Sequence, residues 1–308
     1  MLEMNYESIL LELLTKSIKS SKANAVLFSG GIDSSLITII ASKIRPIVAI
    51  TAIFNNGNDE EYSLRISKKL KIPHIIVKYN IEEALEASKE IIKILKTFDH
   101  IEIRNDITIY IALKKCKEEG IEEIMTGDGG DELFAGYDFM INMKKQELER
   151  YMDLLYKNWN FSSPIIGNVM GLNVYQPFLM EEIIEFAKKL PYEWKINGLY
   201  GKWILRKILE KMGFSEIAWR KKEPIEIGSG SSIITKIFLN MLGEEANKIE
   251  EEALKDGIRF WNREQIFFYK LFREIYGTPP RAKNGCPYCK SPIIQQRCKY
   301  CGYCWRPH

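Results

Sequence analysis

Short apolar runs alternate with amphipathic segments between Ala23 and Tyr137. The amphipathic segments have helical spacing and cover residues 35–44, 59–70, 81–95 and 106–119. The apolar runs have the length of strands and cover residues 25–28, 46–54, 74–79 and 123–127. The run PIVAITAIF at 46–54 is rich in β-branched residues and uncharged, which is typical of a strand buried on both faces. Strands that alternate with helices predict an α/β fold with a doubly wound parallel sheet.

The rest of the chain has a different pattern. Residues 138–277 are mostly helical, and TPPRAKNG at 278–285 has the composition of a linker. A cysteine cluster follows it. We therefore expect a large domain at 1–279 and a small C-terminal domain at 280–308. Ligand sites of open α/β sheets lie at the carboxyl ends of strands, so the glycine-rich loops after 25–28 and 123–127 are the first candidates for a site.

Composition excludes some classes of protein. Of the 308 residues, 46% are apolar and 28% are charged, which is ordinary for a globular protein with a sizeable core. Every apolar stretch is far shorter than the roughly 20 residues of a membrane helix. The N-terminal segment MLEMNYESILLELLTKS carries early acids and helical spacing, unlike a signal peptide. We expect a cytoplasmic protein without a membrane partner.

The net charge of +3 is unevenly distributed along the chain. From Arg281 to His308 there are six basic residues and no acidic one, which leaves 38 basic against 41 acidic residues elsewhere. A basic tail on a mildly acidic body indicates an anionic partner, although a simply solvated tail has the same composition.

The first glycine-rich loop reads SGGIDSS at 29–35. Its glycines permit close approach of the backbone to a ligand, its serines supply hydroxyl donors, and the helix that follows points free N–H groups at the loop. This predicts an anion cradle for a phosphate chain, although no GK[ST] closes it as in a Walker loop. Asp33 would repel a phosphate unless a cation lay between them, so we expect Mg²⁺ there. A glycine turn with a capping aspartate is the alternative.

The second loop reads TGDGGDELFAGY at 126–137. Its acids Asp128, Asp131 and Glu132 lie among glycines directly after a strand. Carboxylates close together raise one another's proton affinity unless a cation joins them, so this loop also predicts a metal. An acidic loop with a helix cap is the alternative, but it does not explain two such loops at neighbouring strand ends.

Together the two loops resemble the synthetase domain of asparagine synthetases and their relatives, which include the β-lactam synthetases. The resemblance covers residues 1–235. Other segments that carry it, in the order of the family, are FDHIEIRNDITIYIAL, PFLMEEIIEFAKKLP, GLYGKWILRKIL and AWRKKEPIEIGSG. The resemblance implies an adenine nucleotide alpha hydrolase-like fold and asparagine biosynthesis or a related ATP-dependent amide ligation.

In the family, a substrate carboxylate attacks the α-phosphate of ATP, pyrophosphate leaves, and an amine then displaces AMP. The resemblance implies that Asp33 and Asp131 bind Mg²⁺, that Asp128 lies near the reacting centre, and that Lys222 stabilises the adenylation transition state. Taken alone, Lys222 would be a surface charge. Arg104 and Arg206 are weaker candidates, and either fits a structural ion pair. The residues expected to hold ATP are Ser29, Gly30, Gly31, Asp33, Ser34, Ser35 and Gly127.

The sequence departs from the family in two places. Asparagine synthetases begin with a glutaminase domain that has an N-terminal cysteine, whereas this sequence starts MLEMNYE and has no cysteine before Cys116. We therefore expect nitrogen to come from ammonia, from a separate glutaminase or from an amine substrate. Met180 stands where the family's PFLD segment has aspartate, so the acceptor carboxylate is left open.

The tail reads CPYCKSPIIQQRCKYCGYC at 286–304. Two C-x-x-C pairs suit one tetrahedral Zn²⁺ in a ribbon, and an iron–sulfur cluster or disulfides are the alternatives. Cys304 and His308 are spare ligands, and Cys116 has the pattern of an ordinary buried thiol. The predicted zinc ligands are Cys286, Cys289, Cys298 and Cys301.

The tail also mixes basic and aromatic residues, which can bind RNA by phosphate contact and stacking. These residues are Lys290, Arg297, Lys299, Arg306, Tyr288, Tyr300, Tyr303 and Trp305. The main hypothesis is a small-molecule amide ligase, and the alternative is a tRNA-modifying ATP pyrophosphatase that grips RNA with its ribbon. A degenerate nucleotide-binding module is a third reading, against which the intact acids Asp33, Asp128 and Asp131 argue.

Overall fold

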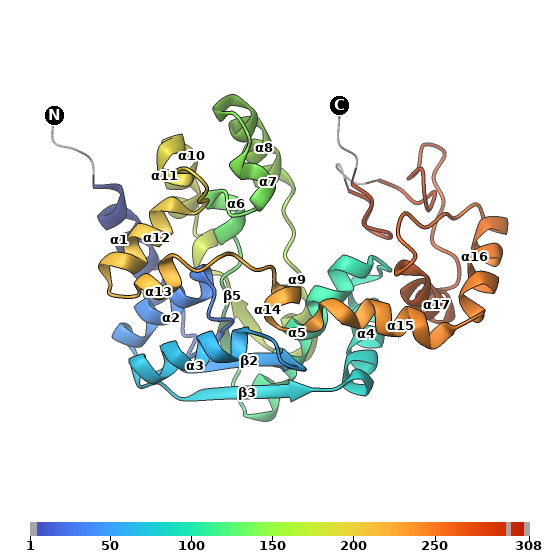
Figure 1. The fold of residues 1–308 in the computed structure, drawn as a ribbon, viewed down its shortest axis with the longest axis horizontal. Coiled ribbons are helices and arrows are strands. Elements are labelled where there is room, and N and C mark those ends of the chain that lie inside the picture. Colours follow the sequence, from blue (N-terminus) through green and yellow to red (C-terminus); the bar gives the residue numbers. More distant parts are fainter. Residues whose placement is uncertain (1–4, 294–296, 305–308) are drawn as a thin grey trace. The chain divides into compact units, whose positions relative to one another are not determined.

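A computed structural model describes residues 5–293 and 297–304. The chain forms two compact units (Figure 1). The first comprises the residues up to Thr51 together with Asn58–Val77 and Ala112–Pro224. The second comprises Ala52–Gly57, Lys78–Ile111 and the residues from Ile225 onward.

The first unit is organised around a five-stranded sheet with the order β3-β2-β1-β4-β5. Strand β1 pairs in parallel with both β2 and β4, and β4 pairs in parallel with β5. The chain therefore builds the sheet outward on one side of β1 and then on the other, so that β1 and β4 form the switch point where ligands bind in such folds. The strands are β1 (Ala25–Leu27), β2 (Val48–Phe54), β3 (His74–Tyr79), β4 (Glu123–Met125) and β5 (Asn173–Tyr175).

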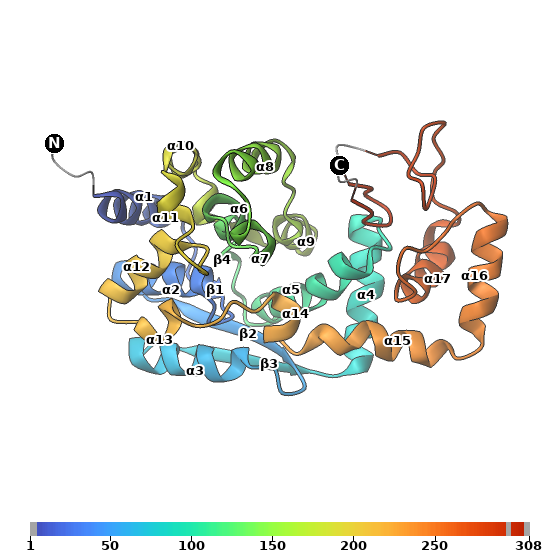
Figure 2. The same ribbon diagram turned by 45° about the horizontal axis from the view of Figure 1, so that its top comes forward.

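Helices cover this sheet and extend beyond it (Figure 2). Helix α5 (His100–Glu118) runs from the second unit into the first. The other helices of the first unit are α1 (Tyr6–Ser20), α2 (Ile32–Ile44), α3 (Asp59–Leu70), α6 (Gly130–Phe134), α7 (Asp138–Ile141), α8 (Lys145–Asn158), α9 (Ser162–Met170), the 3-10 turn η1 (Pro177–Leu179), α10 (Glu181–Lys189), α11 (Tyr192–Lys195), α12 (Trp203–Lys211) and α13 (Ser215–Ala218).

The core of the first unit lies where α1, α2 and α12 pack against one another. Leu10 and Leu14 of α1, Leu36 of α2 and Leu205 of α12 are completely buried there. Each such side chain contributes about 1.5–3 kcal/mol by its removal from water. This packing holds the first turn of α2 in place, and that turn carries the first glycine-rich loop.

The second unit is helical apart from short strand ends. A cluster of aromatic rings forms its core, in which Phe98 lies 5.3 Å from Tyr269 and 5.5 Å from Phe272 between ring centres. The C-terminal cysteine segment belongs to this unit. Its helices are α4 (Ile81–Leu95), α14 (Ile225–Gly228), the 3-10 turn η2 (Ser231–Ile233), α15 (Ile234–Leu242), α16 (Glu245–Lys255) and α17 (Gln265–Tyr276).

The predicted α/β class with a doubly wound parallel sheet and a helical C-terminal part is confirmed. Two details differ from the sequence prediction. Helix α5 begins at His100 rather than near 106, because Asp99 caps it by accepting from the backbone N–H of Ile101 at 3.0 Å. Strand β5 lies in the region predicted to be mostly helical, since three residues are too few to show a strand pattern.

The division into domains at 1–279 and 280–308 stays a prediction. None of the described helices is long and apolar enough to cross a membrane.

Candidate active site and thiol cluster

The first glycine-rich loop is a tight turn between β1 and α2. Gly30 has φ +71°, and a Cβ on it would lie 2.7 Å from the backbone nitrogen of Ser63. The hydroxyl of Ser29 accepts from the backbone N–H of Gly31 at 3.2 Å and contacts the hydroxyl of Ser34 at 3.1 Å. Gly31 caps α2 without a side-chain hydrogen bond, so the first turn of α2 keeps N–H groups available for an anion.

The second loop packs directly on the first. A Cβ on Gly127 would lie 2.9 Å from the backbone nitrogen of Ser34, and a Cβ on Gly130 would lie 2.3 Å from Oδ1 of Asp33. Any side chain at either glycine would separate the loops. These glycines therefore allow the carboxyl ends of β1 and β4 to present their acids together.

Two lysines join the acids of these loops. Nζ of Lys202 bonds to Asp33 and lies 2.9 Å from Oδ1 of Asp131, and Nζ of Lys222 lies 2.5 Å from the same oxygen. We call Asp33, Asp131, Lys202 and Lys222 the charged cluster. Its two carboxylates and two ammonium groups balance in charge, which is how buried ionic groups are ordinarily tolerated.

Burial and charge act in opposite directions within the charged cluster. Burial raises the pKa of Asp33 above its usual value, against the attraction of Lys202. Burial acts in the same sense on Asp131, but Lys202 and Lys222 outweigh it and hold the pKa of that carboxyl below its usual value. Burial lowers the pKa of Lys202, but Asp131 and Asp33 outweigh it and raise that pKa to about 12. The lysines therefore keep Asp131 ionised and ready to bind a cation.

The charged cluster fits a divalent cation. Oδ1 of Asp33 is buried and lacks a hydrogen-bond partner among the described residues, as does the hydroxyl of Ser35. A carboxylate oxygen accepts but cannot donate, so such an atom needs either a donor or a metal. Hard oxygen ligands of this kind are those that Mg²⁺ prefers.

Asp128 has a different environment from the charged cluster. Its Oδ2 accepts from the hydroxyl of Thr126 at 2.8 Å and from the amide of Gln176 at 2.8 Å. The hydroxyl of Ser163 also donates to it. Three neutral donors hold the carboxylate of Asp128, and the structure pairs the lysines with Asp33 and Asp131.

Glu132, the third acid of the second loop, bonds to an aromatic residue. It accepts from the hydroxyl of Tyr137 at 2.5 Å, and burial raises the pKa of Glu132 to about 7. The ammonium of Lys222 lies 4.5 Å from the centre of the Tyr137 ring. Tyr137 therefore helps to orient Lys222 toward Asp131.

Sequence reasoning missed Lys202 and Arg220. Lys202 opens the segment KWILR, which carries part of the family resemblance, but a lysine before a helix is usually a surface residue. Here its side chain is only 4% exposed. Arg220 donates to the carbonyl of Gly30 at 3.3 Å, pairs with Asp59 at 3.2 Å and lies over the Tyr62 ring at 3.7 Å. The AWR motif was the available signal for it.

The two weaker arginine candidates have internal partners. Arg104 forms an ion pair with Glu226 at 2.8 Å. Arg206 donates to the carbonyls of Gly201 at 2.9 Å and Ala218 at 2.6 Å, so it bonds to the backbone rather than to a carboxylate. Both therefore have structural bonds in this state of the protein.

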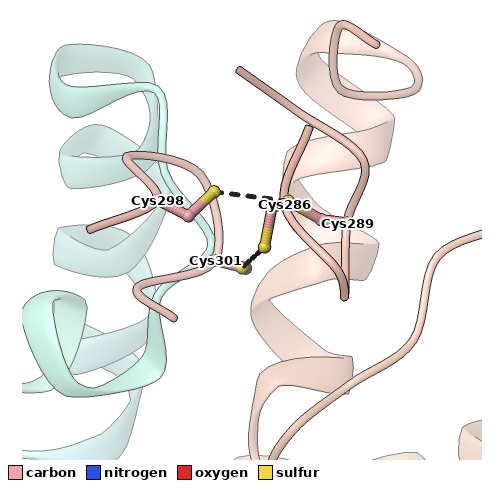
Figure 3. A group of neighbouring side chains, drawn as sticks. All are labelled: Cys286, Cys289, Cys298 and Cys301. Atoms are coloured by element: carbon pink, nitrogen blue, oxygen red, sulfur yellow. Dashed lines mark hydrogen bonds between the residues drawn. The ribbon is translucent and has the colours of Figure 1, made fainter. Parts of the chain in front are cut away.

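The C-terminal cysteines form a second cluster. The Sγ atoms of Cys286, Cys289, Cys298 and Cys301 all lie within 4.8 Å of one another, and all four side chains are buried. Figure 3 shows them converging from two loops. The Sγ atoms of Cys286 and Cys301 lie 3.6 Å apart, and those of Cys289 and Cys298 lie 3.4 Å apart. All are free thiols. We call these four residues the thiol cluster.

The remaining candidates lie elsewhere. Cys304 is exposed and His308 lies outside the described residues. Cys116 is buried, and burial raises the pKa of its thiol to about 12, which keeps it unreactive. The thiol cluster therefore has the residues and spacing of a closed four-thiolate metal site.

Comparison with known proteins places the chain in a family. A family model described as asparagine synthase matches residues 7–162 and 166–284. A Schizosaccharomyces pombe protein named probable glutamine-hydrolysing asparagine synthetase is 29% identical over 322 residues, covering 88% of this chain and 57% of the relative. The glutamine-hydrolysing asparagine synthetase B of Escherichia coli is 26% identical over 308 residues, covering 89% and 54%. The chain thus spans about half the length of the curated relatives it matches.

Solved structures give weaker matches. An NH3-dependent NAD synthetase from Campylobacter jejuni is 14% identical, covers 73% of this chain and 99% of its own, and has a TM-score of 0.32. An NMN synthetase from Francisella tularensis is 19% identical, covers 71% and 96%, and scores 0.33. The family model, in contrast, runs through both glycine-rich loops and through Lys202 and Lys222, and this chain therefore belongs to the asparagine synthase family.

Proposed function

We propose that the chain is an ATP-dependent carbon–nitrogen ligase that adenylates a carboxylate, releases pyrophosphate and passes the acyl group to ammonia or an amine. The charged cluster is the observation that carries this proposal. It places two carboxylates and two lysines on touching glycine loops at the switch point of the sheet. Nucleotidyl transfer needs neutralisation of charge more than covalent help, and these groups supply it.

ATP would lie on the first loop. The uncapped start of α2 and the small side chains around it leave N–H and hydroxyl groups for the phosphates. The residues assigned to ATP are Ser29, Gly30, Gly31, Asp33, Ser34, Ser35 and Gly127.

Asp33 and Asp131 would hold Mg²⁺, which supplies positive charge to the phosphate oxygens when bound. The buried, unpartnered Oδ1 of Asp33 supports this assignment. Lys202 would keep the two carboxylates together before the metal and the nucleotide arrive.

Lys222 and Asp128 are assigned to the chemistry. Lys222 contacts Asp131 and the Tyr137 ring, so its ammonium is held beside the phosphate site, where charge develops as pyrophosphate leaves. Asp128, fixed by Thr126, Ser163 and Gln176, would orient the acceptor near the reacting centre. The acceptor itself is a small carboxylate, with nitrogen delivered as ammonia or an amine, including ammonia from a separate glutaminase.

The test is ATP–pyrophosphate exchange across a panel of carboxylic acids, followed by product analysis with ammonium or amines. We expect one acid to support Mg²⁺-dependent exchange, with AMP formed on addition of the amine. A chain that releases ADP and phosphate, or that supports exchange with none of the acids, would contradict the proposal.

We also propose that the thiol cluster binds one Zn²⁺. Four buried thiols within 4.8 Å of one another suit the tetrahedral geometry of a four-cysteine zinc site. Four buried thiolates this close together would be unfavourable without a cation between them. Metal analysis of the purified protein should find about one zinc per chain. Iron in place of zinc, with a visible charge-transfer band, would instead identify an iron–sulfur cluster.

A further inference from the structure

We propose that the metal of the thiol cluster is an internal cross-link, which fixes the start of α5 to the segment between α16 and α17 within the second unit. This inference rests on the proposed metal site. It assigns the ribbon a role inside the chain.

The second cysteine loop, residues 297–303, is bound through its backbone. The carbonyl of Tyr300 accepts from the backbone N–H of Phe98 at 2.8 Å and from the hydroxyl of Thr97 at 3.2 Å. The carbonyl of Cys301, itself a predicted metal ligand, accepts from the indole N–H of Trp261 at 2.8 Å and from the amide of Gln265 at 2.7 Å. One metal-binding loop therefore contacts two segments that lie far apart in sequence.

The contact at the start of α5 is close and charged. Asp99 is completely buried and forms an ion pair with Arg297, and Gly302 packs so tightly that a Cβ on it would lie 1.9 Å from Oδ2 of Asp99. A buried carboxylate needs such a partner. The residue that supplies it, Arg297, directly precedes the metal ligand Cys298, so the position of the loop decides whether Asp99 stays paired.

The first cysteine loop, residues 286–291, is bound to the segment just before Trp261. The carbonyl of Tyr288 accepts from the backbone N–H of Arg259 at 2.8 Å, just before Trp261. The turn itself closes through bonds from Cys286 N–H to the carbonyl of Ser291 at 2.8 Å and from Lys290 N–H to that of Cys286 at 2.9 Å. The second loop already contacts both segments, and the rings of His100 and Trp261 lie 4.8 Å apart. A metal that joins the two loops would hold the second loop in place and add a further connection from residues 97–99 to Arg259.

The two cysteine loops have weak direct contacts with each other. Among the described residues they meet through the four thiols and through the rings of Tyr288 and Tyr303, whose centres lie 4.7 Å apart. Thiol–thiol contacts are weak, and one ring pair adds only about 0.5–1.5 kcal/mol. A segment this short cannot build an apolar core of its own, so the free energy of metal binding has to order it.

Loss of the metal should also affect polar contacts inside the second unit. Helix α5 begins at His100, and one turn later Arg104 pairs with Glu226 at 2.8 Å. Further along, Thr108 donates to Ser229 at 3.2 Å. Loss of the metal releases the first turn of α5 and loosens these bonds.

The same contacts occupy two of the residues whose side chains could otherwise contact RNA. The guanidinium of Arg297 pairs with Asp99, and the Tyr300 ring lies 6.2 Å from Phe272 in an edge contact. These two side chains serve the internal contact. The geometry thus gives these two side chains a structural role, whereas Lys290 and Lys299 are exposed.

The experiment measures metal content and backbone hydrogen exchange on the full chain. Cys298→Ser removes a ligand, and Cys304→Ser is the matched control because Cys304 is exposed and outside the cluster. We expect wild type and Cys304→Ser to bind one metal and to protect peptides covering 97–108 and 259–266. Cys298→Ser, and wild type treated with a chelator, should exchange in those peptides at least about tenfold faster. A peptide from α1 in the first unit should be unchanged.

The outcomes separate the two claims. A wild-type protein that binds no metal refutes the site itself. A protein that binds one metal, yet protects 97–108 equally after chelation, refutes the cross-link and leaves the site intact. If Cys298→Ser fails to fold, the chelation series on wild type still decides. Pyrophosphate exchange is not needed for either result, so a failure of the proposed ligase activity is seen independently.

Discussion

The charged cluster and the thiol cluster differ in the charges that they bring together and in how these charges are balanced. In the charged cluster, oppositely charged side chains pair across two loops, one carboxylate oxygen is left without a partner among the described residues, and the helix start beside it is uncapped. In the thiol cluster, four like groups converge from two loops, and the backbone around them is bound to neighbouring segments.

The difference indicates which site is built to exchange ligands. Ion pairs between side chains can be replaced by a cation and a phosphate, because each partner of the pair keeps a counter-charge in the new arrangement. Four thiolates around one metal use all of its coordination positions, which leaves none for a substrate. The first cluster therefore suits catalysis and the second suits structure.

The largest effect is expected when an acid of the charged cluster is removed, and this change tests whether that cluster is catalytic. Asp33→Asn and Asp131→Asn should each lower Mg²⁺-dependent pyrophosphate release by about a thousandfold or more, because the metal loses a charged ligand and the phosphates lose neutralisation. Asp138→Asn, at an exposed acid just after the second loop, is the control. Normal release by both variants would remove the metal assignment.

Stability has to be separated from activity in these variants. Asp33→Asn leaves the buried Lys202 with Asp131 as its remaining acidic partner, so the loss of stability should stay below the ~3–5 kcal/mol of a fully unpaired buried charge. The double variant Asp33→Asn with Lys202→Met should recover part of the lost stability in a denaturant titration but none of the activity. Recovery of activity by the double variant would show that Asp33 only balances Lys202.

Lys222 tests the catalytic side of the comparison with a smaller expected effect. Lys222→Ala should lower kcat by about 10²–10³ with little change in the KM for ATP, because the ammonium acts on charge that develops in the transition state. Lys221→Ala, at the exposed neighbour, should leave kcat unchanged. A loss confined to KM would assign Lys222 to ground-state binding of ATP instead.

Gly302 tests the structural side. Gly302 and Gly257 both have positive φ, +72° and +67°, but a Cβ on Gly302 would collide with Asp99 whereas a Cβ on Gly257 has nothing within 4 Å. Gly257→Ala should cost about 1–2 kcal/mol from backbone strain alone. Gly302→Ala should cost a further ~1–3 kcal/mol from the collision. Equal losses in denaturant titrations would mean that the ribbon does not pack on Asp99 in solution.

The smallest expected effect concerns pH and a half-buried histidine of the first unit. Burial lowers the pKa of His74 to about 4, and its two ring nitrogens contact Thr51 at 2.8 Å and Ser67 at 3.0 Å. Between about pH 6.5 and pH 4 the unfolded chain therefore binds a proton that the folded chain does not, so stability should fall as the pH falls through this window. His74→Asn should flatten that slope in unfolding titrations, and an unchanged slope would assign it to other groups.

The amino-acid sequence by itself determined the two glycine-rich loops, the acids in them and the four cysteines. Glycine spacing, strand and helix periodicity and C-x-x-C pairs are local patterns, and the backbone responds to them locally. For the same reason the parallel sheet could be predicted, whereas β5, with three residues, could not.

The tertiary structure alone decided which charges meet. Lys202 lies 169 residues from Asp33 along the chain, and Arg297 lies 198 residues from Asp99. A lysine or an arginine in sequence has the pattern of a surface residue, and only the packing of distant segments places it beside a buried or half-buried carboxylate. Pairing across such separations depends on where the whole core places each backbone, which no local pattern encodes.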